Sequence, residues 1–126
     1  MKTIEISVER TDTGYSAYTL DYPVATVGAT LSELKTNMVE ALNLYFEEVS
    51  GKPVTLANIR VTLDLPQFFE FYKVINATAL SKRIGMNQSL LAQYISGGKK
   101  PSAEQVNRIL VGVREIGKEL AEMELV

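Results

Sequence analysis

The sequence predicts an α+β fold, in which a small β-β-β-α-β N-terminal domain is followed by an all-α helix-turn-helix domain. Three observations lead to this prediction. The start of the chain alternates apolar and polar side chains, which is the period of a half-buried strand. After Pro66 the apolar side chains recur at helical spacing. Residues 80–101 have the pattern of two short helices joined by a tight turn. We therefore expect one domain over residues 1–64 and a second over residues 65–126.

The N-terminal domain opens with a predicted hairpin. Residues 2–10 alternate, so that Ile4, Ile6 and Val8 share one face. Residues 11–14, Thr-Asp-Thr-Gly, are typical turn residues, and residues 15–20 are expected to form the second strand. The segment Asp-Tyr-Pro at 21–23 interrupts that strand, and a short third strand is expected over residues 24–28.

A long amphipathic helix and a fourth strand complete this domain. The sequence Thr-Leu-Ser-Glu at 30–33 predicts a capping box, in which the Thr hydroxyl and the Glu carboxylate each accept a hydrogen bond from a backbone N–H. Gly51 and Pro53 are expected to end the helix, and alternation over residues 59–64 predicts the last strand. The apolar residues that share one broad face of the helix are Leu31, Leu34, Met38, Ala41, Leu42, Tyr45, Phe46 and Val49.

The second domain is expected to begin with a helix whose first turn contains Pro66. Its apolar anchors are Phe68, Phe69, Phe71, Tyr72 and Ile75. A last helix is capped by Ser102, with Gln105 three positions further along. Gly112 and Gly117 interrupt this helix and predict either a break or a close contact with another helix. Its apolar stripe consists of Val106, Ile109, Leu110, Val113, Ile116, Leu120 and Met123.

Between these helices lies the most informative segment. Leu80 and Ile84 lie four residues apart on one face of a short helix, which Gly85 ends because glycine readily adopts the left-handed C′ conformation. Met86 can fill the turn, and Asn87 is a good N-cap for a second helix. Leu90, Leu91 and Tyr94 can face the core, which leaves an exposed face without acidic residues whose amides suit the adenine edge in the major groove. That face consists of Gln88, Ser89, Ala92, Gln93 and Ser96.

The charge of the chain is concentrated on the same segment. Residues 73–103 contain no Asp or Glu but five basic side chains, although the whole chain has a net charge of −2. Residues 1–64 carry five basic and nine acidic side chains. Phosphate neutralisation by Lys and Arg supplies most of the non-specific affinity for DNA, so the chain is expected to bind duplex DNA through residues 77–101, which lie within this acid-free segment. The alternative is a helical hairpin with a solvated basic face.

Composition argues against an enzyme. The 126-residue chain contains no Cys and no His, which removes disulfides, thiolate zinc sites, cysteine nucleophiles and the usual general base. No metal or cofactor is expected. Carboxylate–magnesium chemistry would need several convergent carboxylates, and we interpret Glu5, Glu9 and Asp21 as solvated side chains instead. No apolar run is long enough to span a membrane and the N-terminus does not resemble a signal peptide, so a cytoplasmic protein is expected.

The second half of the chain resembles the Xre, or Cro/repressor-like, DNA-binding domain. The resemblance is carried by Leu80-Ser81, Ile84-Gly85, Asn87-Gln88-Ser89, Leu91, Tyr94, Gly97 and Lys99-Lys100-Pro101. It implies that the helix beginning near Gln88 is the recognition helix, with Gln88, Ser89 and Gln93 contacting bases. It also implies that the following loop grips phosphate through Ser96, Lys99 and Lys100, and Lys82 and Arg83 are added as neighbouring phosphate contacts. Ser81 stands where the family often has Ala.

The whole chain is similar to a HicB-type antitoxin, in which a truncated ribonuclease H-like domain precedes a DNA-binding domain. The N-terminal residues that carry this likeness are Gly14 to Tyr18, Gly28, Thr30 to Glu33 and Ala41-Leu42; the likeness weakens over Thr19 to Val27. It implies an autorepressor that binds its operator and masks a small RNA-cleaving toxin. The alternative is a stand-alone Xre-family regulator whose N-terminal domain senses a ligand or dimerises.

A homodimer is expected because proteins of this class usually bind two-fold operators. Two surfaces are candidates for the dimer interface. One is the apolar stripe over residues 106–123, which could instead pack back on Phe68 and Phe71. The other is the edge of the N-terminal sheet.

Overall fold

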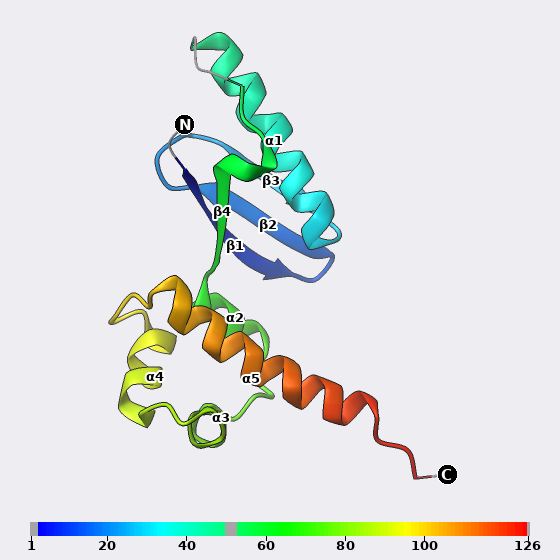
Figure 1. Ribbon diagram of the computed structural model, residues 1–126, viewed down its shortest axis with the longest axis vertical. Helices are drawn as coiled ribbons and strands as arrows, with labels where there is room; N and C mark the ends of the chain where they lie inside the picture. The colour runs from blue at the N-terminus through cyan, green and yellow to red at the C-terminus, as the bar shows by residue number, and fades with distance from the viewer. Residues whose placement is uncertain (1–2, 50–52, 126) are drawn as a thin grey trace. The chain divides into compact units, whose positions relative to one another are not determined.

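A computed structural model describes residues 3–49 and 53–125 and confirms the predicted fold class (Figure 1). Among these residues, four strands form a mixed sheet, a helix lies between the third and fourth strands in the chain, and four helices follow. The chain divides into two compact units between Phe71 and Tyr72. The first is called the N-terminal unit below and the second the C-terminal unit.

The sheet of the N-terminal unit has the order β3-β2-β1-β4. Strand β1 (Ile4–Thr11) pairs antiparallel with β2 (Gly14–Thr19), which pairs antiparallel with β3 (Ala25–Gly28). Strand β4 (Ile59–Leu63) follows a short 3-10 helix, η1 (Leu56–Asn58), and lies parallel to β1. The predicted hairpin and the fourth strand are thus present.

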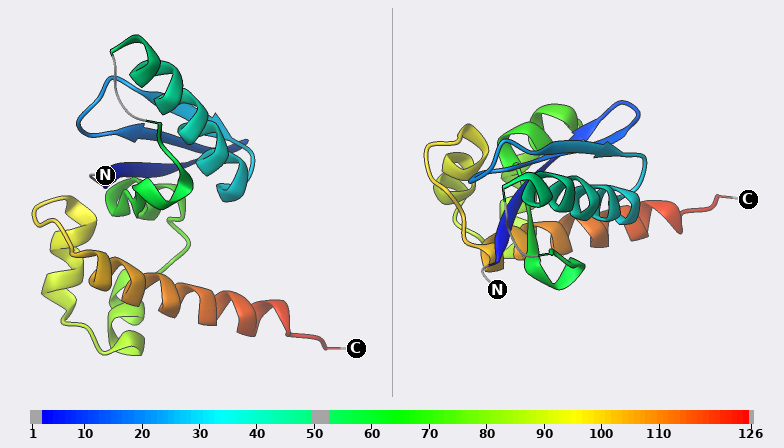
Figure 2. Two further views of the ribbon diagram at one scale, coloured as in Figure 1. Left: turned by 45° about the horizontal axis from the view of Figure 1, so that its top comes forward. Right: turned by 90° about the horizontal axis from the view of Figure 1, so that it is seen from above.

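Helix α1 (Leu31–Glu48) crosses one face of this sheet (Figure 2). The Thr30 hydroxyl accepts a hydrogen bond from the Glu33 N–H at 3.1 Å, which is the Thr half of the predicted capping box. The predicted apolar face of the helix is too long, because both of its ends, Leu31 and Val49, are exposed. Gly51, the expected terminator, lies outside the described residues. The buried core between helix and sheet consists of Ile4, Ile6, Val8, Ala17, Val24, Leu34, Met38, Leu42 and Val54.

Strand β4 forms an edge of the sheet, and its predicted alternation is only partly reflected in burial. Val61 is in register with the buried Ile6, yet 37% of its surface is exposed. The reason is that α1 packs mainly over β2 and β3, so the helix does not cover the middle of this edge strand.

Helix α2 (Leu65–Phe71) packs on β1 and belongs to the N-terminal unit. The Gln67 carboxamide accepts a hydrogen bond from the Arg10 N–H at 2.8 Å and donates one to the Arg10 carbonyl at 2.6 Å. The side chain thereby satisfies both backbone groups of Arg10. The helix also ends before Ile75, which was predicted to be one of its apolar anchors. The compact units therefore divide seven residues after the predicted boundary at 64/65.

The C-terminal unit consists of α3 (Ala77–Ile84), α4 (Gln88–Ser96) and α5 (Ala103–Ala121). Helix α5 runs without a break, so the predicted break at Gly112 and Gly117 is wrong. The other prediction, a close contact with another helix, is confirmed at Gly112. A Cβ atom added to Gly112 would lie 2.3 Å from Cγ2 of Ile84, whereas one added to Gly117 would meet nothing within 4 Å. The buried residues of the unit are Leu80, Ser81, Met86, Leu91, Tyr94, Ile109 and Gly112.

None of the helices within the described ranges combines the length and apolar character needed to cross a membrane.

Candidate nucleic-acid interface

The turn between α3 and α4 is built as the sequence predicts. The Asn76 side chain caps α3 by accepting a hydrogen bond from the Ala79 N–H at 3.0 Å. Gly85 ends the helix in the left-handed conformation, with φ of 66°. Met86 is buried, and its N–H donates to the Ser81 carbonyl at 2.9 Å. Asn87 then caps α4 by accepting from the Leu90 N–H at 3.1 Å. The two helices thus meet at a defined turn.

Ser81 is compatible with the packing of the two helices. It is 1% exposed, and its hydroxyl donates a hydrogen bond to the Thr78 carbonyl at 2.7 Å. A buried hydroxyl without a partner would be destabilising. Because its partner is one turn earlier on the same helix, Ser fits here almost as a small apolar residue does.

Arg108 of α5 closes the turn from outside, a role that no pattern in the sequence indicates. Its Nη2 donates to the carbonyl of Ile84 at 3.0 Å and to that of Gly85 at 2.8 Å. The last carbonyls of a helix lack partners within it and favour a cation. Arg108 therefore ties the C-terminal end of α3 to α5, and so helps hold the turn that sets the direction of α4.

The three predicted base-contacting residues share the exposed face of α4. Gln88, Ser89 and Gln93 are exposed, whereas Leu91 and Tyr94 of the same helix are buried. Ala92 and Ser96 are also exposed, as predicted. Gln88 is partly oriented within the motif, because its Nε2 donates to Oγ1 of Thr78 on α3 at 3.3 Å. The face carries carboxamides and hydroxyls, which are groups that can pair with base edges.

Of the predicted phosphate contacts, three lysines have accessible charges. Lys82, Lys99 and Lys100 are exposed, and none of them forms an ion pair with another described residue. Arg83 differs, because its guanidinium forms an ion pair with the Glu119 carboxylate of α5. To contact phosphate, Arg83 would have to exchange this partner. Glu119 is the acidic neighbour that local sequence could not reveal, since it lies 36 residues away.

Ser96 organises the loop that carries the two lysines. Its hydroxyl donates to the Gln93 carbonyl at 3.2 Å and accepts from the Gly98 N–H at 3.3 Å. Gly97 ends α4 with φ of 82°, and the Lys99 N–H returns to the Gln93 carbonyl at 3.2 Å. The loop after α4 is therefore held by its own hydrogen bonds. A direct phosphate contact by Ser96 would compete with them.

The N-terminal unit presents a second surface, the face of the sheet opposite α1. Strand alternation places Tyr18 and Val27 on this face, because Ala17 and Gly28 beside them are buried. Val27 is 66% exposed and Tyr18 is 40% exposed. The Glu5 carboxylate on the same face lies 3.7 Å from Arg60. Within residues 3–49 and 53–125 no group of three or more acidic side chains could hold a metal ion.

Comparison with models of known protein families and with curated proteins gave no match to this chain.

Proposed function

We propose that this chain is a cytoplasmic DNA-binding antitoxin and autorepressor of a HicAB-like toxin–antitoxin system. The observation that carries the proposal is the exposed, uncharged face of α4 within a segment that has five basic and no acidic side chains. The assignment to an antitoxin rests further on the resemblance of the N-terminal half to HicB proteins and on the sheet face that this half exposes.

In this proposal α4 enters the major groove of duplex DNA. The carboxamides of Gln88 and Gln93 each combine an NH2 donor group with a carbonyl acceptor, the pair of groups that adenine matches through N7 and N6. Lys99 and Lys100 follow the C-terminal end of α4, and Lys82 lies on α3. Phosphate contacts from these lysines would fix the register of α4 on the duplex, and the amides would supply the sequence preference.

The N-terminal unit is proposed to bind the toxin through the face formed by Tyr18 and Val27. Exposed apolar side chains on an open sheet face favour a protein partner. The excess of acidic side chains in residues 1–64 suits a basic partner such as an RNA-cleaving protein, and would mainly raise the association rate and specificity.

A reporter assay tests the autorepressor function. The DNA that precedes this reading frame would drive a reporter, and the chain would be supplied from a second plasmid. We expect repression by the wild-type chain and its loss when Gln88 and Gln93 are both replaced by Ala. Equal reporter output with and without the chain would contradict the proposal.

Co-expression tests the antitoxin function. The neighbouring reading frame would be induced with the wild-type chain, with Val27→Asp, or with the exposed control Leu44→Asp on α1, whose side chain is 62% exposed. We expect wild type and Leu44→Asp to restore growth and Val27→Asp to fail. A neighbouring frame that is harmless by itself would favour the stand-alone regulator instead.

A further inference from the structure

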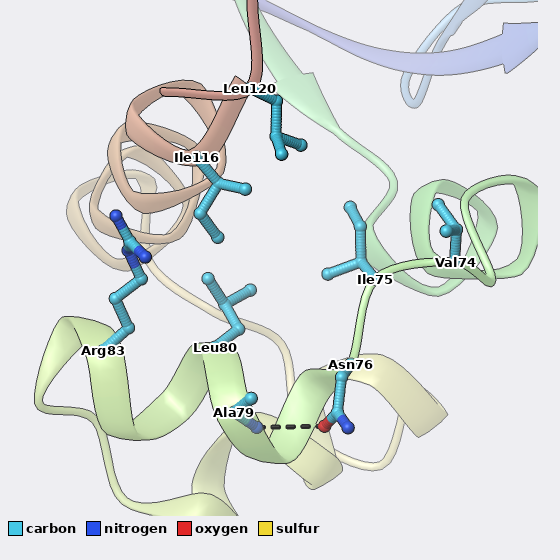
Figure 3. A pocket seen from close by; sticks show the side chains of 8 residues that line it. All are labelled: Val74, Ile75, Asn76, Ala79, Leu80, Arg83, Ile116 and Leu120. Carbon is cyan, nitrogen blue, oxygen red and sulfur yellow. Dashed lines mark hydrogen bonds between the residues drawn. The ribbon is translucent and has the colours of Figure 1, made fainter. Parts of the chain in front are cut away.

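Helices α3 and α5 are in close contact where α3 ends. A Cβ atom added to Gly112 of α5 would lie 2.3 Å from Cγ2 of Ile84, the last residue of α3. Beside this contact the helices leave an apolar groove of about 430 Å³, in which the side chains of Leu80 and Ile116 point toward one another (Figure 3). The end of α3 that leads into the turn is therefore held against α5.

Arg108 lies one helical turn before Gly112 on α5 and contacts the backbone at this end of α3. A single nitrogen of its guanidinium, Nη2, donates to the carbonyl of Ile84 at 3.0 Å and to that of Gly85 at 2.8 Å. These carbonyls belong to the two peptide groups on either side of the Gly85 Cα atom. Because peptide groups are planar, the relative orientation of the two carbonyls is set by the φ and ψ angles of Gly85. A group that binds both carbonyls therefore restrains those angles.

Gly85 needs such a restraint more than another residue would. Glycine populates many backbone conformations readily, and here it adopts φ of 66° and ψ of 32°. Two N–H groups of the turn are held from within α3. The Gly85 N–H donates to the Lys82 carbonyl at 3.3 Å. The Met86 N–H donates to the Ser81 carbonyl at 2.9 Å. The last carbonyls of a helix have no such partner within it, and Arg108 supplies one from α5.

The second arginine between these helices acts differently. Arg83 pairs with Glu119, but 41% and 60% of the two side chains are exposed, and ion pairs between exposed side chains contribute little to stability. Arg108 is exposed as well, yet its partners are backbone carbonyls at a helix C-terminus, where a charged donor is favoured. Of the two arginines, Arg108 is the one that acts on the backbone of the turn.

We infer that Arg108 is a positioning residue for DNA recognition. By restraining Gly85 it fixes the direction in which α4 presents Gln88 and Gln93, and it does so without contacting DNA. This inference deepens the proposed function and rests on it. A carboxamide reads a base only within narrow hydrogen-bond distances and angles, whereas lysines on flexible stems keep their phosphate contacts through a small rotation of α4. Loss of Arg108 should therefore lower the preference for the operator more than the affinity for random DNA.

Anisotropy titrations of the full chain measure this preference, as the ratio of its affinities for the duplex that precedes its reading frame and for a scrambled duplex. We expect Arg108→Met to lower the ratio by a factor of about ten or more. Arg114→Met is the matched control, because Arg114 is an exposed arginine on the same helix, and it should keep the wild-type ratio. Both variants remove one positive charge, so their affinities for the scrambled duplex should agree within about twofold.

A conservative variant distinguishes positioning from a general loss of structure. In Arg108→Lys a single ammonium nitrogen can donate to both carbonyls, as Nη2 does in the wild type, so this variant should recover most of the ratio. If circular dichroism shows that Arg108→Met is unfolded at the temperature of the titration, Arg108→Gln takes its place, because the Gln side chain is too short to reach both carbonyls. An unchanged ratio, an equal loss on both duplexes, or no recovery with Lys would overturn the inference.

Amide hydrogen exchange followed by NMR tests the same inference without DNA. The Met86 N–H, which follows Gly85, should exchange about tenfold faster in Arg108→Met than in the wild type, because local opening of the turn becomes easier. The Leu80 N–H, which donates to the Asn76 carbonyl at 2.9 Å near the start of α3, should exchange at the wild-type rate. Equal acceleration at both amides would indicate destabilisation of the whole unit and contradict the inference.

The two measurements separate this inference from the proposed function. Faster exchange at Met86 in a chain that binds no DNA would leave Arg108 as the residue that holds the turn and refute the DNA-binding function. A chain that prefers its operator, and keeps that preference in Arg108→Met, would retain the function and refute the inference.

Discussion

Lys99 and Lys100 combine exposure with the absence of an ion-pair partner among the described residues. Replacing both by Ala should weaken binding to specific and random DNA alike. Each phosphate contact contributes about 0.9 to the slope of log K against log salt, so the slope should fall by about 2 in magnitude. Fluorescence anisotropy titrations at several salt concentrations measure this slope.

The control for this double substitution removes two lysine charges at other positions in the chain. Lys35 on α1 and Lys118 on α5 are exposed, and the double Ala variant should keep the slope of the wild type. If the two double variants change the slope equally, the effect is one of net charge and the assignment of Lys99 and Lys100 fails.

Gln88 and Gln93 should behave differently from the lysines. Gln→Ala at either position should cost about 1–3 kcal/mol on the specific site and little on random DNA, because base contacts carry the sequence preference. Gln88 also donates to Thr78, so Thr78→Val serves as the control that removes this support and keeps the carboxamide. An equal loss on both DNAs would reassign the residue to the phosphate backbone.

Residue identity predicted the local features of this region but not its long-range partners. Gly85 and Asn87 were recognisable because a left-handed φ and a helix cap each favour particular residue types. The contacts of Arg108 and Arg83 were not recognisable. Their partners lie 23 to 36 residues away, and no periodicity in the sequence links them.

The packing of α3 against α5 depends on the missing side chain of Gly112. Gly112→Ala would place a Cβ atom 2.3 Å from the γ-methyl of Ile84, which is held by a β-branched side chain and cannot swing away cheaply. We expect a loss of about 1–3 kcal/mol in the free energy of unfolding. Thermal unfolding followed by circular dichroism at 222 nm would show this as a lower Tm.

Gly117 on the same helix is the matched control. Since a Cβ atom there meets nothing within 4 Å, Gly117→Ala should stabilise the helix by about 0.5–1 kcal/mol. If both substitutions shift the Tm in the same direction, the close approach of α3 and α5 at Gly112 is refuted.

Helix α2 shows why a boundary drawn from periodicity differs from the division into compact units. Its apolar residues have helical spacing, as do those of the helices that follow. Periodicity therefore predicts that α2 belongs to the same domain as those helices. What assigns α2 to the N-terminal unit is Gln67, whose carboxamide pairs with the backbone of Arg10, 57 residues earlier. The order of strands and helices could be predicted from periodicity and turn residues, whereas this pairing is a tertiary contact.

The division into two units makes a prediction about truncation. A fragment of residues 72–126 should fold, because α3, α4 and α5 enclose their own buried side chains. It should bind DNA without neutralising a co-expressed toxin. The measurements are circular dichroism, anisotropy titration and a growth assay. Neutralisation equal to that of the full chain would show that the N-terminal unit is not the toxin-binding part.

The most direct test is an anisotropy titration of the full chain against two duplexes of equal length and composition. One has the sequence that precedes its own reading frame, and the other is a scrambled version. At about 0.15 M salt, where non-specific affinity is reduced, we predict that the first duplex binds at least a thousandfold more tightly, the lower bound typical of specific recognition. Equal affinity for both duplexes, or no binding to either at low salt, would contradict the account.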